Sequence, residues 1–288
     1  MSALSYERVV ALLPECERAR VESYCRDRTK AEPDVYSGEV EPLVLAYAIG
    51  FWLHRHYFRV RSSGVENLPG HGAAVIVANH SGVLPFDAAM LGVDIFRHSE
   101  PSRVLHYMVD HFAYRWPYLG TLFRALGQLA GTRRNFDGLV ESGHLIGVFP
   151  EGAKALGKPA SQRYELFPFS PGHVELAARH RVPVVPVGIV GAEEQQTMLT
   201  NLRPLARALR LPYFPITTTF PWFGPLGLLP KPVRYYLSYG EPLAIDPATT
   251  RSMRVRTEQV ARVRRAVQDL VTTGLARRRS PAAAPEAP

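Results

Sequence analysis

The sequence predicts an α/β fold, with a mixed, mostly parallel central sheet flanked by helices. Short apolar runs without charged residues recur at 73–78, 145–150 and 182–190, and such runs are typical of strands buried on both faces. Longer stretches of mixed polarity and helical length separate these runs, as in chains where strands alternate with helices. An amino-terminal helical extension precedes this pattern.

The composition indicates one sheet-bearing domain and an anionic partner. The 288 residues carry a formal net charge of +8, and this length fits one α/β domain with terminal extensions better than two equal domains. Cys16 and Cys25 lack the spacing of a disulfide framework or a metal site, so we expect neither. No zinc finger, RNP motif or helix-turn-helix is recognisable. An anionic lipid surface or a phosphorylated substrate is therefore favoured over nucleic acid.

Four segments are expected along the chain. Residues 1–56 form a helical, membrane-associating segment, 57–245 the sheet-bearing domain, 246–279 a basic amphipathic helix and 280–288 a disordered, low-complexity tail,. Within the first segment, 2–30 reads as a helix broken at Pro14. The amino terminus has neither the basic n-region nor the apolar h-region of a signal peptide, so no cleaved leader is expected.

The apolar helix expected at 43–53 has two possible explanations. Its eleven residues, LVLAYAIGFWL, are too few to span a bilayer, which takes about 20 apolar residues. Tyr47, Trp52 and a cationic end suit a helix lying at a membrane interface. A helix that is apolar on nearly all sides also suits a buried core position. If the first explanation holds, the protein sits peripherally on the cytoplasmic face of the cell membrane.

The remaining elements follow from local patterns. Strands are expected at 57–61, 73–78, 103–109, 145–150, 182–190 and 234–239, with a short strand or turn at 127–134,. Helices are expected at 86–96, 112–126, 135–142, 171–181 and 253–275,. Pro183 and Pro186 place their strand near a sheet edge or a bulge. The segment 211–232, rich in Pro and aromatic residues, either packs over the core or forms an apolar lid, and packing is favoured.

A histidine and an aspartate follow the strand at 73–78. His80 lies just past its carboxyl end, where open α/β sheets place their ligand sites. On one continuous helix His80 and Asp87 would be about 10 Å apart along the axis, so the chain must turn, which Gly82 permits. Pro85 suits the first turn of the next helix. His80 can then act as a base oriented by Asp87, or the two residues merely cap a turn and a helix.

Basic residues follow two other segments. Lys154 and Lys158 fall in the loop after the strand at 145–150, and they are two of only four lysines in a chain that otherwise uses arginine. That placement suggests a compact point charge directed at phosphate. Arg133 ends the segment 127–134, and by itself it would be explained equally well as part of a solvated helix face.

Four segments in order resemble the conserved blocks of the glycerolipid acyltransferase family, whose best-known members are lysophosphatidic acid acyltransferases. The first block is Asn-His followed by an aspartate, and here it is Asn79-His80 with Asp87. The second is a glycine leading to an arginine, here Gly127 and Arg133. The third is Phe149-Pro150-Glu151-Gly152, and the fourth is the apolar strand with a central proline at 182–187. The resemblance covers roughly residues 57–243.

This resemblance implies transfer of an acyl group from acyl-CoA or acyl-carrier protein to a hydroxyl of a glycerolipid, without a cofactor or metal. It implies that His80 is the general base and Asp87 its orienter. The residues expected to contact substrate are Asn79, Ser81, Gly82, Arg133, Glu151, Gly152, Lys154 and Lys158. The favoured acceptor is 1-acylglycerol-3-phosphate, which would give phosphatidic acid.

Three departures from the family pattern bear on the acceptor. Six residues separate His80 from Asp87, whereas the family usually has four, and the longer spacing is closer to the diacylglycerol and neutral-lipid branch. Lys154 stands where phosphate-binding members carry arginine, and Ser170 where lysine is common. A neutral or other lysolipid acceptor, or a non-catalytic lipid-binding relative, are therefore the alternatives. A serine hydrolase is disfavoured because the sequence has no G-x-S-x-G elbow.

Overall fold

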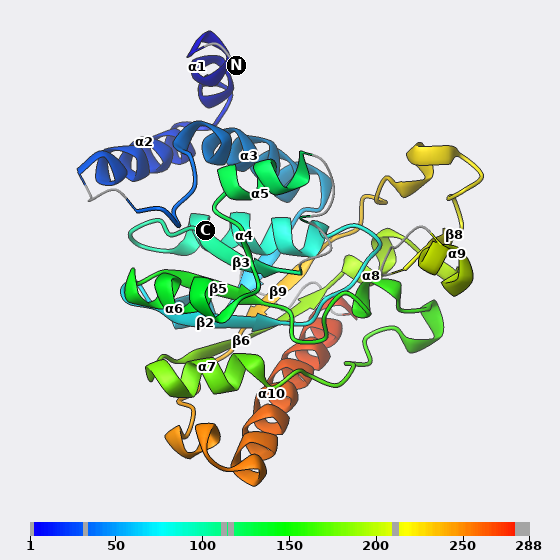
Figure 1. The fold of residues 1–288 in the computed structure, drawn as a ribbon. Coiled ribbons are helices and arrows are strands. Elements are labelled where there is room, and N and C mark those ends of the chain that lie inside the picture. Colours follow the sequence, from blue (N-terminus) through cyan, green and yellow to red (C-terminus); the bar gives the residue numbers. More distant parts are fainter. Residues whose placement is uncertain (1–2, 31–33, 111–113, 115–117, 209–212, 280–288) are drawn as a thin grey trace.

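A seven-stranded sheet organises the described part of the chain, which comprises residues 3–30, 34–110, 114, 118–208 and 213–279 of this computed structural model (Figure 1). Its strands run in the order β1 (Arg61–Ser63), β9 (Tyr236–Tyr239), β6 (Val184–Val190), β2 (Ala74–Ala78), β5 (Leu145–Val148), β3 (Leu105–Val109) and β4 (Leu129–Ala130). β6 and β9 pair antiparallel, and the other neighbours pair parallel. The predicted fold class is confirmed. β7 (Met198–Asn201) and β8 (Pro215–Thr217) form a separate two-stranded sheet.

Helices cover both faces of the sheet (Figure 1). On one face lies α4 (Phe86–His98), covered in turn by α3 (Val40–Trp52) and α2 (Glu15–Lys30). On the other face pack α6 (Arg133–Glu141), α7 (Gly172–His180) and α10 (Met253–Arg279). The shorter helices are α1 (Ala3–Ala11), α5 (Leu119–Ala125), α8 (Ala192–Gln195) and α9 (Arg203–Ala208).

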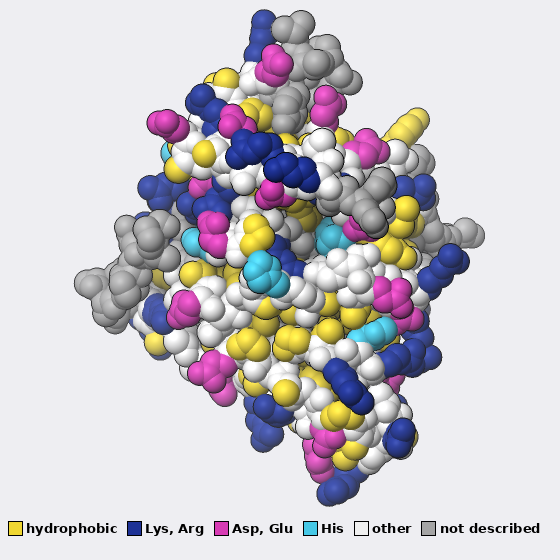
Figure 2. All heavy atoms as spheres, turned by 90° about the vertical axis from the view of Figure 1, so that its left-hand side faces the viewer, with side chains coloured by type: hydrophobic (Ala, Val, Ile, Leu, Met, Phe, Trp, Pro, Cys, Tyr) yellow, Lys and Arg dark blue, Asp and Glu magenta, His cyan; other side chains and the backbone are white. Residues whose placement is uncertain are grey.

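The central strand β2 is buried on both faces. Val75 and Val77 pack in the core beneath α7 and α10, whereas Ala74, Ile76 and Ala78 pack beneath α4. Two-sided burial is the reason that residues 73–78 form an unbroken apolar run. β2 and its parallel neighbour β5 deliver the predicted site residues to the same edge of the sheet,. Figure 2 views the opposite edge, at the amino ends of the parallel strands, where charged side chains of both signs are interspersed.

The proline-containing strand β6 lies inside the sheet, between β9 and β2, so its predicted place at an edge is wrong. The predicted bulge is present instead. Val187 pairs with Tyr239, but Val184 pairs with Leu243, so the antiparallel register shifts by one residue between them. Pro186 sits within that shift, where its missing N–H costs the ladder little.

Some predicted boundaries are wrong at their ends. The edge strand predicted at 57–61 is displaced and begins only at Arg61, as β1. A π-helical turn, Leu53–Tyr57, extends α3 instead, and the Phe58 and Val60 N–H groups donate back to the carbonyls of Leu53 and His54. Arg133 belongs to α6, which begins two residues before the predicted helix. Residues 111–113 and 115–117, within the predicted helix 112–126, and the tail 280–288 lie outside the described residues.

Helix α4 carries a second aspartate that is fully buried. Asp94 Oδ1 lies 2.8 Å from His54 Nε2, at the end of α3. It also accepts from the hydroxyl of Ser62 at 2.5 Å, and its Oδ2 accepts from the Tyr239 hydroxyl at 2.6 Å. Burial alone would raise the pKa of Asp94, but the hydrogen bonds and charges of His54 and His98 hold it far below its ordinary value,. Asp94 thereby joins α3, α4 and two strands.

Helix α3 has one side in the core and one side exposed. Val44, Tyr47 and Phe51 are buried in a core cluster with residues of α2 and α4. On its other side Ile49 and Trp52 are each 56% exposed. Within the described residues no helix is long and apolar enough to cross a membrane.

The described part of the aromatic segment 211–232 does not pack over the core as predicted. Its first residues, Tyr213 and Phe214, are half-buried. Trp222 and Phe223 are 73% and 68% exposed, however, and the segment extends away from the sheet beside β8 and α9 (Figure 1). The chain folds back on itself between Thr219 and Gly227, where the Thr219 hydroxyl donates to the Gly227 carbonyl.

Neighbouring residues of α3 give a test of its buried face. Phe51→Ala should lower the free energy of unfolding by about 3–5 kcal/mol, because it leaves a cavity among packed side chains. Trp52→Ala, one residue along the helix, should cost less than about 1 kcal/mol in the absence of membranes. Urea unfolding of both variants measures the difference. Similar losses for the two variants would contradict the observed orientation of α3.

Candidate active site

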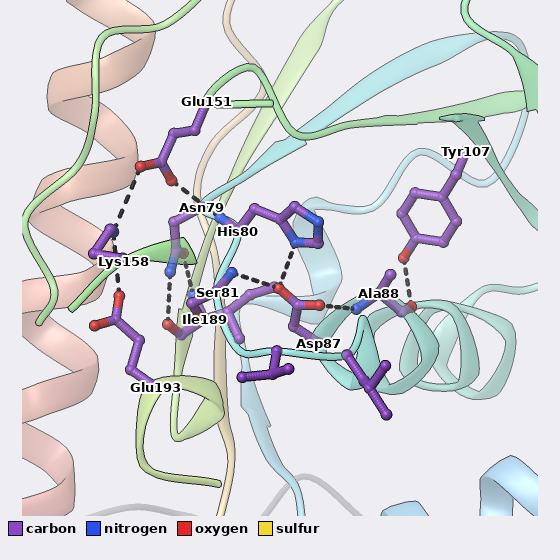
Figure 3. A network of polar contacts seen from close by, with 12 residues as sticks. Asn79, His80, Ser81, Asp87, Ala88, Tyr107, Glu151, Lys158, Ile189 and Glu193 are labelled. Carbon is purple, nitrogen blue, oxygen red and sulfur yellow. Dashed lines mark hydrogen bonds and ion pairs between the residues drawn. The ribbon is translucent and has the colours of Figure 1, made fainter. Parts of the chain in front are cut away.

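His80 and Asp87 meet in the loop between β2 and α4 (Figure 3). The chain leaves β2 at Ala78 and turns at Gly82, whose φ of +93° is one that glycine adopts readily,. α4 begins after Pro85, which places Asp87 in its first turn. The His80 Nδ1 atom then lies 2.7 Å from Asp87 Oδ2. The predicted turn brings the pair together, as a continuous helix could not.

Backbone donors fix the carboxylate of Asp87, which is fully buried. Its Oδ2 accepts from the Ser81 N–H at 2.9 Å, and its Oδ1 accepts from the Ala88 N–H at 2.8 Å. A carboxylate is only an acceptor, so the His80 Nδ1 carries the proton and donates to Asp87. The Nε2 atom of His80 is left with its lone pair. This is the tautomer that a general base requires.

A stack of three rings holds the plane of the His80 imidazole. The ring of Phe149 lies against it, with centroids 4.1 Å apart and planes 17° apart. Tyr107 stacks on the far side of Phe149 at 5.5 Å, and its hydroxyl donates to the Ala88 carbonyl at 2.6 Å. Burial, and to a lesser extent the charge of Asp87, raise the pKa of Tyr107, so its phenol stays a donor. The aromatic face also favours an imidazolium beside it.

The carboxylate of Glu151 joins the His80 loop to the loop that follows β5. Its Oε1 accepts from the His80 N–H at 3.0 Å, and its Oε2 accepts from the Phe167 N–H at 2.7 Å. Glu151 is buried, so these bonds form without competition from water,. The structure therefore places Glu151 behind the histidine, where it sets the backbone of the loop.

Lys158 is buried between two carboxylates (Figure 3). Its Nζ lies 3.6 Å from Glu151 Oε2 and 3.3 Å from Glu193 Oε1, and its side chain is only 3% exposed. Burial raises the pKa of Glu193, and the ammonium group of Lys158 opposes that rise,. The predicted phosphate contact of Lys158 gains no support from this geometry, since the cation is already paired inside the protein.

Asn79 is also engaged inside the protein. Its side-chain Nδ2 donates to the carbonyl of Ile189 at 2.9 Å, while its Oδ1 accepts from the Ile189 N–H at 2.7 Å. This two-bond clamp ties the end of β2 to β6, so Asn79 positions the next residue, His80. The predicted substrate contact by Asn79 would have to displace one of these bonds.

The other predicted site residues differ in their exposure. The Ser81 hydroxyl is buried, and no hydrogen bond to it is found within the described residues. Gly152, with a φ of +69°, and Lys154 are exposed in the loop after β5. Arg133 is exposed at the start of α6. Across the ranges that the structure describes, no hydrogen bond or ion pair joins Lys154 or Arg133 to the histidine.

One cavity is lined in part by the His80 loop, and a second is linked to that loop through Tyr213. An apolar one of about 310 Å³ lies among α3, α4, α5 and β3, and its wall includes Pro85, Ala88 and Tyr107. A polar one of about 810 Å³ carries Lys154 and Arg207. Tyr213 also lines the polar cavity, and its hydroxyl donates to the carbonyl of Val83 in the His80 loop.

Sequence reasoning missed four residues at this site. Tyr107 and Tyr213 lie far from the motifs, and Arg207 lies in a short helix. Phe149 was recognised only as part of the Phe-Pro-Glu-Gly motif, without a role of its own. No local sequence pattern indicated Tyr107. None of the other contacts is encoded by local spacing, because each depends on how distant segments meet.

The loop that carries the His80–Asp87 dyad thus lines an apolar cavity at Pro85, and Tyr213 links the same loop to a cavity with two cations. Comparison with known proteins gives the class of the protein: the chain belongs to the Acyltransferase family, whose model matches residues 59–190. An uncharacterized protein of Mycobacterium tuberculosis strain H37Rv is 39% identical over 261 residues, which cover 89% of this chain and 71% of that protein.

Two further proteins extend the comparison. The human protein named DGAT1/2-independent enzyme synthesizing storage lipids is 26% identical over 212 residues, covering 72% of this chain and 59% of its own. The crystal structure of the 1-acyl-sn-glycerophosphate acyltransferase PlsC from Thermotoga maritima matches with a TM-score of 0.51 at 18% identity. That match covers 95% of this chain and 97% of the other. It establishes a shared fold.

The buried lysine gives a prediction with a defined pH dependence. Lys158→Met leaves the carboxyl groups of Glu151 and Glu193 without their cation, which raises the pKa of Glu193 further above its ordinary value of 4.5. A carboxyl group with a raised folded pKa loses stability as the pH rises through that pKa. We expect a loss of about 3–5 kcal/mol near pH 8, and a smaller loss near pH 4.5.

Urea unfolding at the two pH values measures this dependence. Lys154→Met, an exposed lysine of the same loop, is the matched control and should change the free energy of unfolding by less than about 0.5 kcal/mol at either pH. A loss for Lys158→Met that is the same at both pH values would contradict the assigned ion pairs.

Proposed function

We propose that this protein transfers a fatty acyl group from a thioester donor, acyl-CoA or an acyl-carrier protein, to a hydroxyl group of a glycerolipid. The observation that carries the proposal is the hydrogen-bonded His80–Asp87 dyad in a loop that lines an apolar cavity. Membership of the Acyltransferase family supports it.

The chemistry needs one proton carrier. His80 Nε2 takes the proton of the acceptor hydroxyl as its oxygen attacks the thioester carbonyl carbon. The new C–O bond forms and the C–S bond breaks, and the imidazolium returns the proton to the leaving thiolate. Asp87 and the face of Phe149 stabilise the imidazolium in between,. No acyl-enzyme is required, so no serine or cysteine nucleophile enters the scheme.

The developing negative charge on the thioester oxygen needs donors. In the turn after β2, the N–H groups of His80, Ser81 and Val83 donate to side chains of the protein. We therefore assign the oxyanion to the N–H of Gly82 and the buried hydroxyl of Ser81, neither of which has such a partner in the described contacts.

The two cavities suggest how the substrates lie. The fatty chain would occupy the apolar cavity beneath α3, where Pro85 and Ala88 bring it next to the dyad,. A phosphate group of the acceptor or of coenzyme A would meet Lys154 and Arg207 in the polar cavity,. Arg133, Glu151 and Gly152 would complete the acceptor site as the family resemblance implies.

We favour 1-acylglycerol-3-phosphate as the acceptor, with phosphatidic acid as the product. A neutral glycerolipid acceptor is the second candidate, because six residues separate His80 from Asp87 and because the human relative is named as an enzyme synthesizing storage lipids. Since either acceptor resides in a bilayer, we place the protein peripherally on the cytoplasmic face of the membrane, in contact with anionic lipid.

The first test of this function removes the base. His80→Ala should lower acyl transfer by about 10²–10⁴-fold, because no other group near the acceptor hydroxyl can take its proton. Thioester consumption with and without a lysolipid acceptor measures the transfer, and thermal unfolding checks the fold. Asp87→Asn, which keeps the shape but favours the wrong tautomer, is the companion variant. A folded His80→Ala protein with more than a tenth of the activity would falsify the role.

The second test separates the acceptors. Lys154→Ala should raise the KM for a phosphorylated lysolipid about tenfold, because a charge-assisted contact is lost, and should leave the KM for a neutral acceptor nearly unchanged. Lys30→Ala, an exposed lysine of α2, is the matched control. If the two acceptors respond equally to Lys154→Ala, the lysine does not read the acceptor phosphate.

A further inference from the structure

The chain contains one long stretch without charge that protrudes from the folded domain. No Asp, Glu, Lys or Arg occurs between Arg210 and Lys231. The part of this stretch from Thr218 to Pro230, here termed the apolar projection, extends away from the sheet beside β8 and α9 (Figure 1). Its large side chains are exposed to a degree unusual for their type: Trp222 73%, Phe223 68%, Leu226 72% and Leu229 62%.

The apolar projection has a defined internal structure. The Thr219 hydroxyl donates to the carbonyl of Gly227 at 2.7 Å, and the N–H groups of Phe220 and Thr219 donate to the Thr217 hydroxyl at 2.8 and 3.2 Å. Gly227 fits only as glycine, since a Cβ there would lie 2.5 Å from the Thr219 carbonyl oxygen. The exposed side chains are therefore presented by a preformed loop, at little further cost in conformational entropy.

The base of the apolar projection is bonded to the His80 loop. Gln196, which is buried, accepts from the Val83 N–H at 3.1 Å and donates to the carbonyl of Leu228. The Lys231 N–H donates to the carbonyl of Gln195 at 2.7 Å, and the side chain of Gln195 reaches the carbonyl of Leu84 at 3.3 Å. A partner that binds the apolar projection would therefore hold His80 at a fixed distance from itself.

The projection also continues into the exposed side of α3. The Tyr57 hydroxyl donates to the carbonyl of Pro230 at 2.6 Å, and the Tyr57 ring stacks on Trp52. Cations flank this junction: Arg59 donates to the Pro232 carbonyl at 2.9 Å, and Lys231 is exposed at the end of the uncharged stretch. An uncharged apolar tip with tryptophan and a cationic base matches the layers of a bilayer with anionic head groups.

We propose that the apolar projection inserts into the outer part of an anionic lipid bilayer and, together with Ile49 and Trp52, docks the protein there. This inference deepens the proposed function by naming the surface through which the site meets its lipid. A lipid partner is favoured over a protein partner because the projection adjoins a site with a cavity for a fatty chain. A second copy of the chain is the competing occupant.

Vesicle flotation tests the proposal without requiring turnover. The full chain should float with vesicles of phosphatidylcholine and phosphatidylglycerol, and binding should weaken with salt. Trp222→Ser with Phe223→Ser should lower the partition coefficient about tenfold or more. The control is Val35→Ser with Met253→Ser, which removes two side chains of similar exposure, 86% and 76%, elsewhere on the surface. The control variant should float as the unmodified protein does.

Fluorescence adds a direct readout of insertion. Trp52→Phe with Trp116→Phe leaves Trp222 as the single tryptophan of the three. Its emission should shift to shorter wavelength with vesicles and become protected from acrylamide. Unchanged emission, or full flotation of the Trp222→Ser, Phe223→Ser variant, would overturn the proposal. So would concentration-dependent dimers that this variant abolishes.

The outcome separates this inference from the proposed function. The Trp222→Ser, Phe223→Ser variant should keep its activity on a water-soluble, short-chain acceptor, since neither residue lies in the catalytic machinery. If the unmodified protein floats as expected but transfers no acyl group, the inference stands and the proposed function fails. If the unmodified protein transfers acyl groups but the apolar projection plays no part in flotation, the proposed function stands and the inference fails.

Discussion

The buried carboxylate of Glu151 is the constraint on which the site depends. It accepts hydrogen bonds from His80, at the end of β2, and from Phe167, and it pairs with Lys158. These three partners are up to 87 positions apart in the chain. A buried carboxylate is unfavourable by itself, so its three partners are needed for the fold and not only for the site.

This arrangement assigns different tasks to residues of one motif. Phe149 stacks on the imidazole, Glu151 sets the backbone behind it, and Gly152 turns the chain outward with a positive φ. Pro150 accepts from the Ser170 N–H at 2.9 Å and so closes the loop that carries Lys154 and Lys158. The motif therefore builds the wall of the site, whereas the exposed Lys154 beyond it remains free to meet a ligand.

The sequence allowed the fold class and the dyad to be predicted because both follow from local patterns. The strand at 73–78 is apolar on both faces, and a glycine and a proline mark the turn between His80 and Asp87. The burial of Lys158 could not be predicted locally, because it depends on Glu193, which lies 35 residues later. Of the two positions that the sequence allowed for the Pro186 strand, an edge or a bulge, the structure has the bulge, and only the pairing with β9 decides between them. α3 combined a core face with an exposed one, which composition alone does not separate.

Helix α4 fixes a length within the molecule. Asp87 and Asp94 lie seven residues apart on it, and an α-helix rises about 1.5 Å per residue, so the two carboxylates are about 10 Å apart along its axis. One of them holds His80, and the other holds His54 at the end of α3. α4 thus fixes the distance between the imidazole of His80 and α3, whose exposed side carries Trp52. Sliding α4 by a single turn would break both pairs at once. The distance between His80 and α3 is therefore set by the rise of this helix.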